Sequence, residues 1–102
     1  MSTSVARRDA VQEVVATIDR PEFQQQLAEM LPTGLSLETF TRHAKLAIQM
    51  NPELLTAERS SLFLAMVRGA ASGLLPDGRE SAFVIVKSKG VEKVQWWSMI
   101  AF

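Results

Sequence analysis

The sequence contains no cysteine and only one histidine. The absence of cysteine excludes disulfides, thiolate metal sites and cysteine nucleophiles. His43 has no second histidine or carboxylate cluster at metal-ligand spacing, and it lies near Arg42 and Lys45 in a polar helical region, which favours a solvated surface histidine over a general base. No glycine-rich phosphate loop of a nucleotide-binding protein occurs. We therefore expect no metal, no cofactor and no enzymatic activity.

A surplus of charge of one sign is also missing, since 11 basic residues stand against 11 acidic ones. The whole chain therefore exerts no net attraction on a polyanion, and a nucleic-acid surface has to be local. From Arg79 to Lys93 there are four basic residues and two acidic ones, a surplus of two. Uncharged stretches are too short to span a bilayer, and residues 1–20 carry charges where a signal peptide needs an apolar run. We expect a cytoplasmic protein with no membrane partner.

The length of 102 residues, with 47% hydrophobic and 22% charged residues, is typical of one small folded domain. Proline, glycine and the apolar periodicity divide it into a variable N-terminal helix over 1–20, a helical part over 21–75, and a turn with a β-hairpin over 76–102. The last of these also includes the expected start of a further helix. We treat the whole chain as a single, incomplete domain.

Helix boundaries are marked by residues with specific backbone roles. Pro21 suits the first turn of a helix, Ser36 suits an N-cap, and Gly73 suits a left-handed C-cap. Asn51-Pro52 stops the helix that precedes it, because proline disfavours the helical conformation at the residue before it. The small residues of 69–73 allow another backbone to approach closely. Apolar residues recur at helical spacing within 1–20 and over 21–31, 36–50 and 58–72.

The apolar period changes near the C-terminus. Ala82 to Val86 is apolar on both faces, as in a central strand, whereas Val94 and Trp96 alternate with polar residues, as in a half-exposed strand. Residues 88–90 predict a hairpin turn with glycine at the strained position. The expected fold is therefore α+β, with N-terminal helices followed by a β-hairpin of an incomplete antiparallel sheet. Because residues 96–102 also end the chain on hydrophobic side chains, we expect a fragment, or a chain completed by other copies of itself.

The most distinctive segment runs from Gly73 to Glu80. In the simplest interpretation, glycine caps the helix, Pro76 and Asp77-Gly78 form a turn, and Arg79 and Glu80 are solvated. That interpretation requires no function. A functional interpretation depends on the order of several segments along the chain.

Segments spread over most of the chain share their order and spacing with one known family. They are 23–32, Phe40 with Arg42, 51–55, 60–62, 70–74, 76–80, the strands 83–87 and 93–97, and 99–101 as the start of a helix. Together they resemble the N-terminal part of the RecT family, phage and prophage recombinases that anneal complementary single strands without ATP. Residues 1–20 have no counterpart, and proteins of that family are longer.

The resemblance implies an activity in homologous recombination and DNA repair. It implies a homo-oligomer, a ring or filament, that holds single-stranded DNA and an annealed duplex intermediate in a basic groove and works beside a partner exonuclease. Annealing requires that a strand be held by its phosphates while its base edges stay free, so cations and aromatic platforms are the useful groups. The candidate DNA-binding residues are Arg79, Lys87, Lys89, Lys93 and Trp97.

Two of these assignments depend on neighbouring residues. Adjacent strand residues point to opposite faces. Trp96 shares its face with Val94 and is therefore expected in the core, while Trp97 on the other face is expected to stack on a DNA base or to contact another part of the protein. Arg42 and Lys45 are weaker DNA candidates, because Glu38 is placed to pair with Arg42.

Other functions stay open. One alternative is an oligomerisation or interaction module without DNA binding of its own, which the small local charge surplus favours. A helix-turn-helix protein using 36–50 and 58–72 is disfavoured, because the connection is long and the second helix is apolar and small-sided. An enzyme is the least favoured interpretation.

Overall fold

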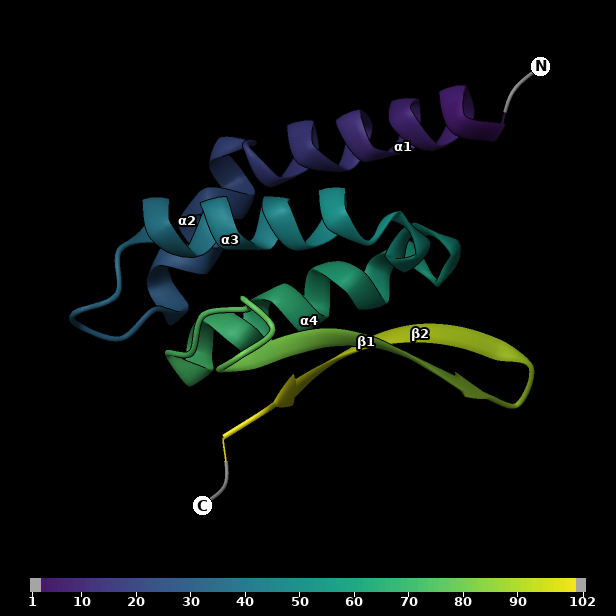
Figure 1. The fold of residues 1–102 in the computed structure, drawn as a ribbon. Helices are drawn as coiled ribbons and strands as arrows, with labels where there is room; N and C mark the ends of the chain where they lie inside the picture. The colour runs from purple at the N-terminus through teal and green to yellow at the C-terminus, as the bar shows by residue number, and fades with distance from the viewer. Residues whose placement is uncertain (1–2, 101–102) are drawn as a thin grey trace.

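The computed structural model describes residues 3–100, and four α-helices precede a two-stranded antiparallel sheet (Figure 1). The expected α+β fold, with N-terminal helices and a β-hairpin, is confirmed. The elements are α1 (Thr3–Ile18), α2 (Pro21–Met30), α3 (Leu37–Met50), the 3₁₀ helix η1 (Pro52–Thr56), α4 (Arg59–Ser72), β1 (Ser81–Ser88) and β2 (Val91–Ser98).

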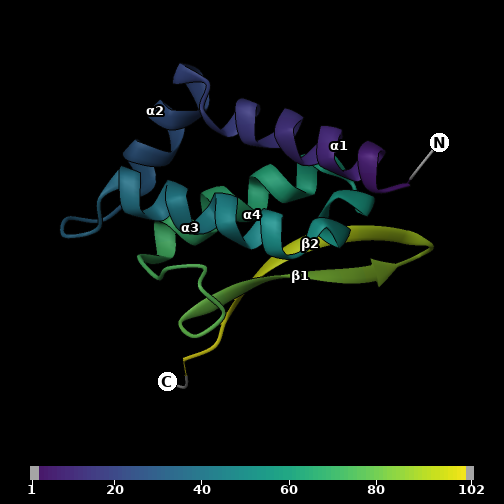
Figure 2. The same ribbon diagram turned by 45° about the horizontal axis from the view of Figure 1, so that its top comes forward.

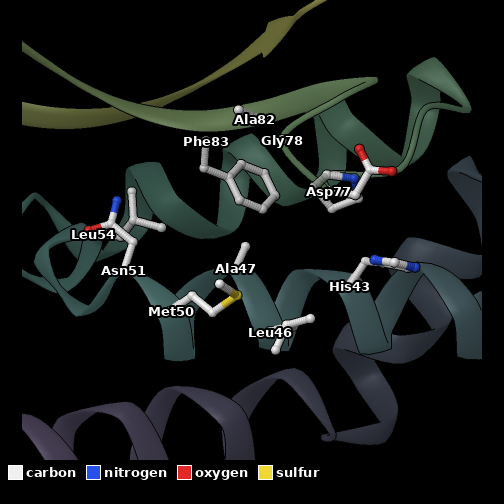
Figure 3. A pocket seen from close by; sticks show the side chains of 11 residues that line it. His43, Leu46, Ala47, Met50, Asn51, Leu54, Asp77, Gly78, Ala82 and Phe83 are labelled. Atoms are coloured by element: carbon white, nitrogen blue, oxygen red, sulfur yellow. The ribbon is translucent and has the colours of Figure 1, made fainter.

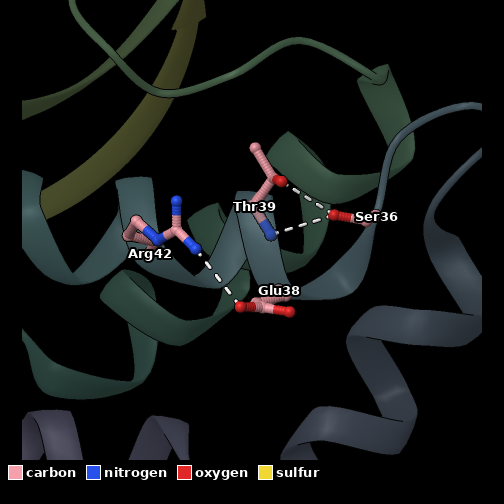
Figure 4. Close-up of polar contacts among 4 residues, drawn as sticks. All are labelled: Ser36, Glu38, Thr39 and Arg42. Carbon is pink, nitrogen blue, oxygen red and sulfur yellow. Dashed lines mark hydrogen bonds and ion pairs between the residues drawn. The ribbon is translucent and has the colours of Figure 1, made fainter.

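The helix boundaries follow the capping residues of the sequence. Pro21 occupies the first turn of α2, and the hydroxyl of Ser36 accepts the backbone N–H of Thr39 at 3.1 Å, which caps α3 (Figure 4). Gly73 ends α4 with a φ of +77°. These predictions are confirmed. The 3₁₀ helix after Asn51 is an addition, because the sequence predicted only the end of α3 at this point.

All helices lie on one side of the hairpin, as Figures 1 and 2 show from two directions. Helix α4 packs directly on β2, while α1 packs on α3, farther from the sheet. Gly69 of α4 makes the close approach possible, since a Cβ there would lie 3.0 Å from Cδ1 of Trp96. The small residues of α4 therefore accommodate an indole ring, not a second backbone. The largest fully buried side chains are Val14, Ile18, Leu27, Phe40, Ile48, Leu54, Leu62 and Met66.

The hairpin turn consists of two residues, and Ser88 pairs with Val91 across it. Lys89 and Gly90 both have positive φ, +52° and +79°. We expected the strained conformation at glycine alone, but two-residue turns of this kind require it at both positions. Lysine therefore adopts a conformation that L-residues seldom populate.

The two faces of the hairpin have different surroundings. Phe83, Ile85, Val94 and Trp96 pack against the helices. The opposite face, here called the open face, has no other described element on it (Figure 1). It consists of Ala82, Val84, Val86, Ser88, Val91, Lys93, Gln95 and Trp97.

The expectation of an incomplete sheet holds for the described residues. Strand β1 is apolar on both faces, yet only one face is covered and only one strand pairs with it. The helix expected to begin at 99–101 is not present at Met99 and Ile100, which have no helical structure. Ala101 lies outside the described residues.

Candidate nucleic-acid interface

Three of the predicted DNA-binding cations lie near the tip of the hairpin, and all three are exposed. They form what we call the tip group, Lys87, Lys89 and Lys93. Lys87 stands opposite Glu92 in the register and shares its face with the residues that pack on the helices, whereas Lys93 belongs to the open face. Lys89 lies in the turn. The structure thus gathers these lysines at one end of the sheet but not on one face.

Arg79 is exposed on a turn that is fixed by its neighbour Asp77. Oδ1 of Asp77 accepts the backbone N–H groups of Glu80 and Arg79, at 2.9 and 2.8 Å. These bonds favour the charged carboxylate, first through the N–H of Glu80 and then through that of Arg79, and they lower the pKa of Asp77. The expectation that Glu80 is simply solvated is wrong, because it is half-buried and its Oε1 accepts the N–H of Leu75 at 3.1 Å.

The turn and the tip of the hairpin lie far apart. Strand β1 separates them, and seven steps of about 3.3 Å put its ends roughly 23 Å from one another. Trp97 pairs with Ala82 and therefore belongs to the same end as Arg79. One chain does not bring the five predicted residues into a continuous row. The expectation that side chains from several copies line one continuous track stays a prediction.

Trp97 is held in place on the open face. Its side chain is 50% exposed, and its Nε1 donates a hydrogen bond to Oε1 of Gln95 at 3.0 Å. Gln95 stands between Trp97 and Lys93 on this face. The neighbouring Trp96 packs against the core, so the predicted division between the two tryptophans is confirmed. Gln95 was missed by the sequence analysis, although its position two residues from Trp97 was the signal.

None of the predicted DNA-binding cations forms an ion pair with another described residue. Within the described chain, the ion pairs are Glu38–Arg42 at 3.2 Å (Figure 4) and Asp19–Lys45 at 2.6 Å. Both involve the α3 cations that were weaker candidates. The cations of the hairpin and of the preceding turn are therefore free to contact phosphates, while the α3 cations already have carboxylate partners.

A groove that the sequence did not predict lies between α3 and β1 (Figure 3). It has a volume of about 400 Å³, and Leu46, Met50 and Phe83 line its apolar part. His43 and Asp77 both line one end of this groove. His43 is half-buried there and not fully solvated as expected. The signal in the sequence was the presence of Leu46 and Met50 outside the buried stripe of α3.

Searches for other kinds of site give no candidate in the part of the chain that is described. Within residues 3–100, no group of three or more His, Cys, Asp or Glu side chains is arranged to hold a metal ion. No helix in that range is both long and apolar enough to cross a membrane. Comparison with protein-family models gives no match, and comparisons with curated proteins and with solved structures give no significant match. The resemblance to the RecT family stays a prediction.

Proposed function

We propose that this chain binds single-stranded DNA through its hairpin and the turn before it, and that it promotes ATP-independent annealing of complementary strands as a RecT-type protein. The observation that carries the proposal is the set of exposed cations without ion-pair partners, Arg79 and the tip group, together with the half-exposed Trp97. No acid–base or nucleophilic chemistry is needed for this activity.

The residue types match what annealing demands. Lysine and arginine hold a strand by its phosphates without reading sequence, so the bases stay available to a second strand. Trp97 offers an aromatic surface to one base, worth about 1–3 kcal/mol per stacked base in proteins of this kind. Its hydrogen bond to Gln95 fixes the ring before DNA arrives, which reduces the entropy lost on binding. In this proposal a homo-oligomer presents many such hairpins to the DNA.

A second candidate function is an oligomerisation module whose DNA groove lies outside these residues. The overall charge balance of 11 basic and 11 acidic residues supports it, because the chain as a whole does not attract DNA. The uncovered face and edge of the hairpin support it as well, since both are suited to protein contacts.

Salt-dependent binding separates the two functions. We expect a fluorescently labelled oligo-dT strand to bind with an affinity that falls as salt rises, with a slope of about 0.7 per neutralised phosphate. Replacing Lys87, Lys89 and Lys93 with glutamine removes three such contacts and should lower the slope by up to about 2.1. The control, Arg42→Gln with Lys45→Gln, removes cations that are already paired and should leave the slope unchanged.

Trp97→Ala tests the stacking contact. A loss of about 1–3 kcal/mol corresponds to a binding constant roughly 5- to 150-fold weaker, at any salt concentration. The annealing rate of two complementary oligonucleotides should fall in the same variants. Annealing by the triple lysine variant at the wild-type rate would contradict the proposed interface, and no DNA binding at low salt would favour the oligomerisation module.

A further inference from the structure

One edge of the hairpin is closed by α4. The backbone N–H of Glu58 donates to the carbonyl of Glu92 at 2.9 Å, and the N–H of Val94 donates to the hydroxyl of Ser61 at 2.8 Å. The backbone groups of Glu92 and Val94 therefore point away from β1. In an antiparallel pair, residues opposite such positions also point outward. This identifies the outward-facing residues of β1, which are Phe83, Ile85 and Lys87.

The outer edge of β1 is open along these three residues. No hydrogen bond from another described residue reaches their outward N–H and C=O groups. Natural proteins blunt such edges with charges, proline or a bulge, because an open edge pairs with other strands. Residues 82–86 contain neither charge nor proline, and the register with β2 runs without a bulge. Protection of this edge is therefore confined to its end, where Lys87 carries a charge, and the apolar stretch before Lys87 is suited to pair with a partner strand.

We propose that the partner is a second copy of this chain, whose β1 pairs antiparallel with β1 across a two-fold axis at Ile85. The edge along β1 is the one left fully open, since Glu58 and Ser61 already bond to the other edge at Glu92 and Val94. A single edge that pairs with itself joins two copies and no more, so a larger ring or filament forms through other surfaces of this dimer. The two hairpins become one four-stranded sheet, which is more stable than a two-stranded one.

The position of the axis follows from hydrogen bonding and charge. With the axis at Ile85, the free groups of Phe83 and Lys87 in one copy meet those of Lys87 and Phe83 in the other. An axis at Val84 would instead place Lys87 opposite Ser81, whose carbonyl already accepts the N–H of Gly78 at 2.9 Å. It would also place Lys89 opposite Arg79, where like charges repel.

Charge complementarity supports the same register. Around Ile85, Lys89 of each copy falls opposite Ser81 of the other, next to Glu80 in sequence. The carboxylate of Asp77 lies in the same turn and is ionised near neutral pH, as an aspartate with an ordinary or lowered pKa is. At each end of the paired strands, Lys89 of one copy therefore meets a turn of the other that carries two carboxylates, Asp77 and Glu80, and one cation, Arg79.

Exposed apolar side chains next to the β1 edge would also be partly buried by the second copy. The groove between α3 and β1 opens beside Phe83, and Leu46 and Met50 on its far wall are 46% and 77% exposed (Figure 3). The approach of a second copy along β1 removes part of this surface from water, which favours the dimer.

Cysteine cross-linking tests the axis, and the native chain contains no cysteine that would interfere. Ile85→Cys places two thiols opposite one another, and mild oxidation of the full chain should give one covalent dimer. Lys93→Cys is the control, because Lys93 lies on β2 and away from the axis, and it should stay monomeric after denaturation. Circular dichroism establishes that both variants are folded. A folded Ile85→Cys variant without covalent dimer would overturn the proposal.

Sedimentation equilibrium without DNA tests the edge itself. Wild-type protein should show a monomer–dimer equilibrium. The N–H of Lys87 points outward, so Lys87→Pro removes no hydrogen bond within the hairpin. It does remove one hydrogen bond at each end of the dimer interface, and the dissociation constant of the dimer should rise about tenfold or more. Lys87→Ala keeps the N–H and should change the dissociation constant of the dimer by less than about threefold. A wild-type monomer at all concentrations, or equal effects of both variants, would refute this dimer.

The dimer stands independently of DNA binding. Both lysine variants lack the same charge, so the loss of DNA affinity that this charge causes is common to them, whereas the change in mass, measured without DNA, is specific to proline. Failure of the proposed function and failure of the dimer are therefore distinguishable.

Discussion

Ser61 connects α4 to the hairpin, and its replacement by alanine gives a sharp test of how the candidate interface is positioned. The hydroxyl accepts the N–H of Val94 at 2.8 Å, and both residues are buried, at 8% and 4% exposure. Ser61→Ala removes the acceptor and leaves a buried N–H without a partner, which costs about 1–3 kcal/mol. In a domain of this size, 1 kcal/mol corresponds to about 4–8 °C, so the melting temperature should fall by about 4–24 °C.

The adjacent Ser60 supplies the matched control. Its hydroxyl donates to Oε1 of Glu58 at the exposed surface, so Ser60→Ala should change the free energy of unfolding by less than about 0.5 kcal/mol. Urea unfolding followed by circular dichroism measures both variants, and amide hydrogen exchange at Val94 reports the local effect. Equal stability of the two variants, with unchanged protection at Val94, would refute the connection between α4 and β2.

Two further predictions concern the turns on either side of the site. Gly73→Ala should lower the free energy of unfolding by about 1–2 kcal/mol because φ is +77°, and by more because the new Cβ would lie 2.9 Å from Cγ of Pro32. Gly78→Ala, with φ of +82° and no neighbour near the new Cβ, should show only the loss due to φ. Equal losses of the two variants in urea unfolding would contradict the Pro32 contact. The pKa of Asp77 is lowered in the folded chain by the N–H of Glu80, so its contribution to stability is present above about pH 4 and is lost as pH falls through the lowered value. Melting temperatures between pH 2 and pH 6 should therefore depend less on pH in Asp77→Asn, and identical profiles would contradict this.

The helices could be predicted from the sequence because their signals are local. The N-cap at Ser36 and the C-cap at Gly73 each act within one turn of chain, and each was placed correctly. The end of α2 has no such local signal, because Met30 and Leu31 are adjacent and both apolar. The structure leaves Met30 43% exposed and packs Leu31 against the core. Tertiary packing decided between two equally apolar neighbours.

The arrangement of the site could not be predicted to the same degree. Lys87, Lys89 and Lys93 are expected to be exposed because they are charged. The face of the sheet on which each side chain lies, however, depends on the register of the hairpin. A shift by one residue would have moved every side chain of a strand to the opposite face. The register is set by a two-residue turn that includes Lys89 at positive φ, a conformation that sequence patterns did not assign to lysine. The groove beside His43 depends on the spacing of α3 from β1, which no local signal encodes.

The two proposals, taken together, explain why the predicted cations lie at opposite ends of one hairpin. In a single chain, Arg79 is separated from the tip lysines by the length of β1, about 23 Å. Pairing two copies around Ile85 places Lys89 of one opposite Ser81 of the other, two residues from Arg79. The two groups then become neighbours, and cations from both copies gather at each end of the four-stranded sheet. A phosphate backbone crossing that sheet would meet a continuous row that neither copy offers alone. On this account DNA binding should weaken when the dimer is disrupted, so Lys87→Pro should bind oligo-dT more weakly than Lys87→Ala although the two variants carry the same charge.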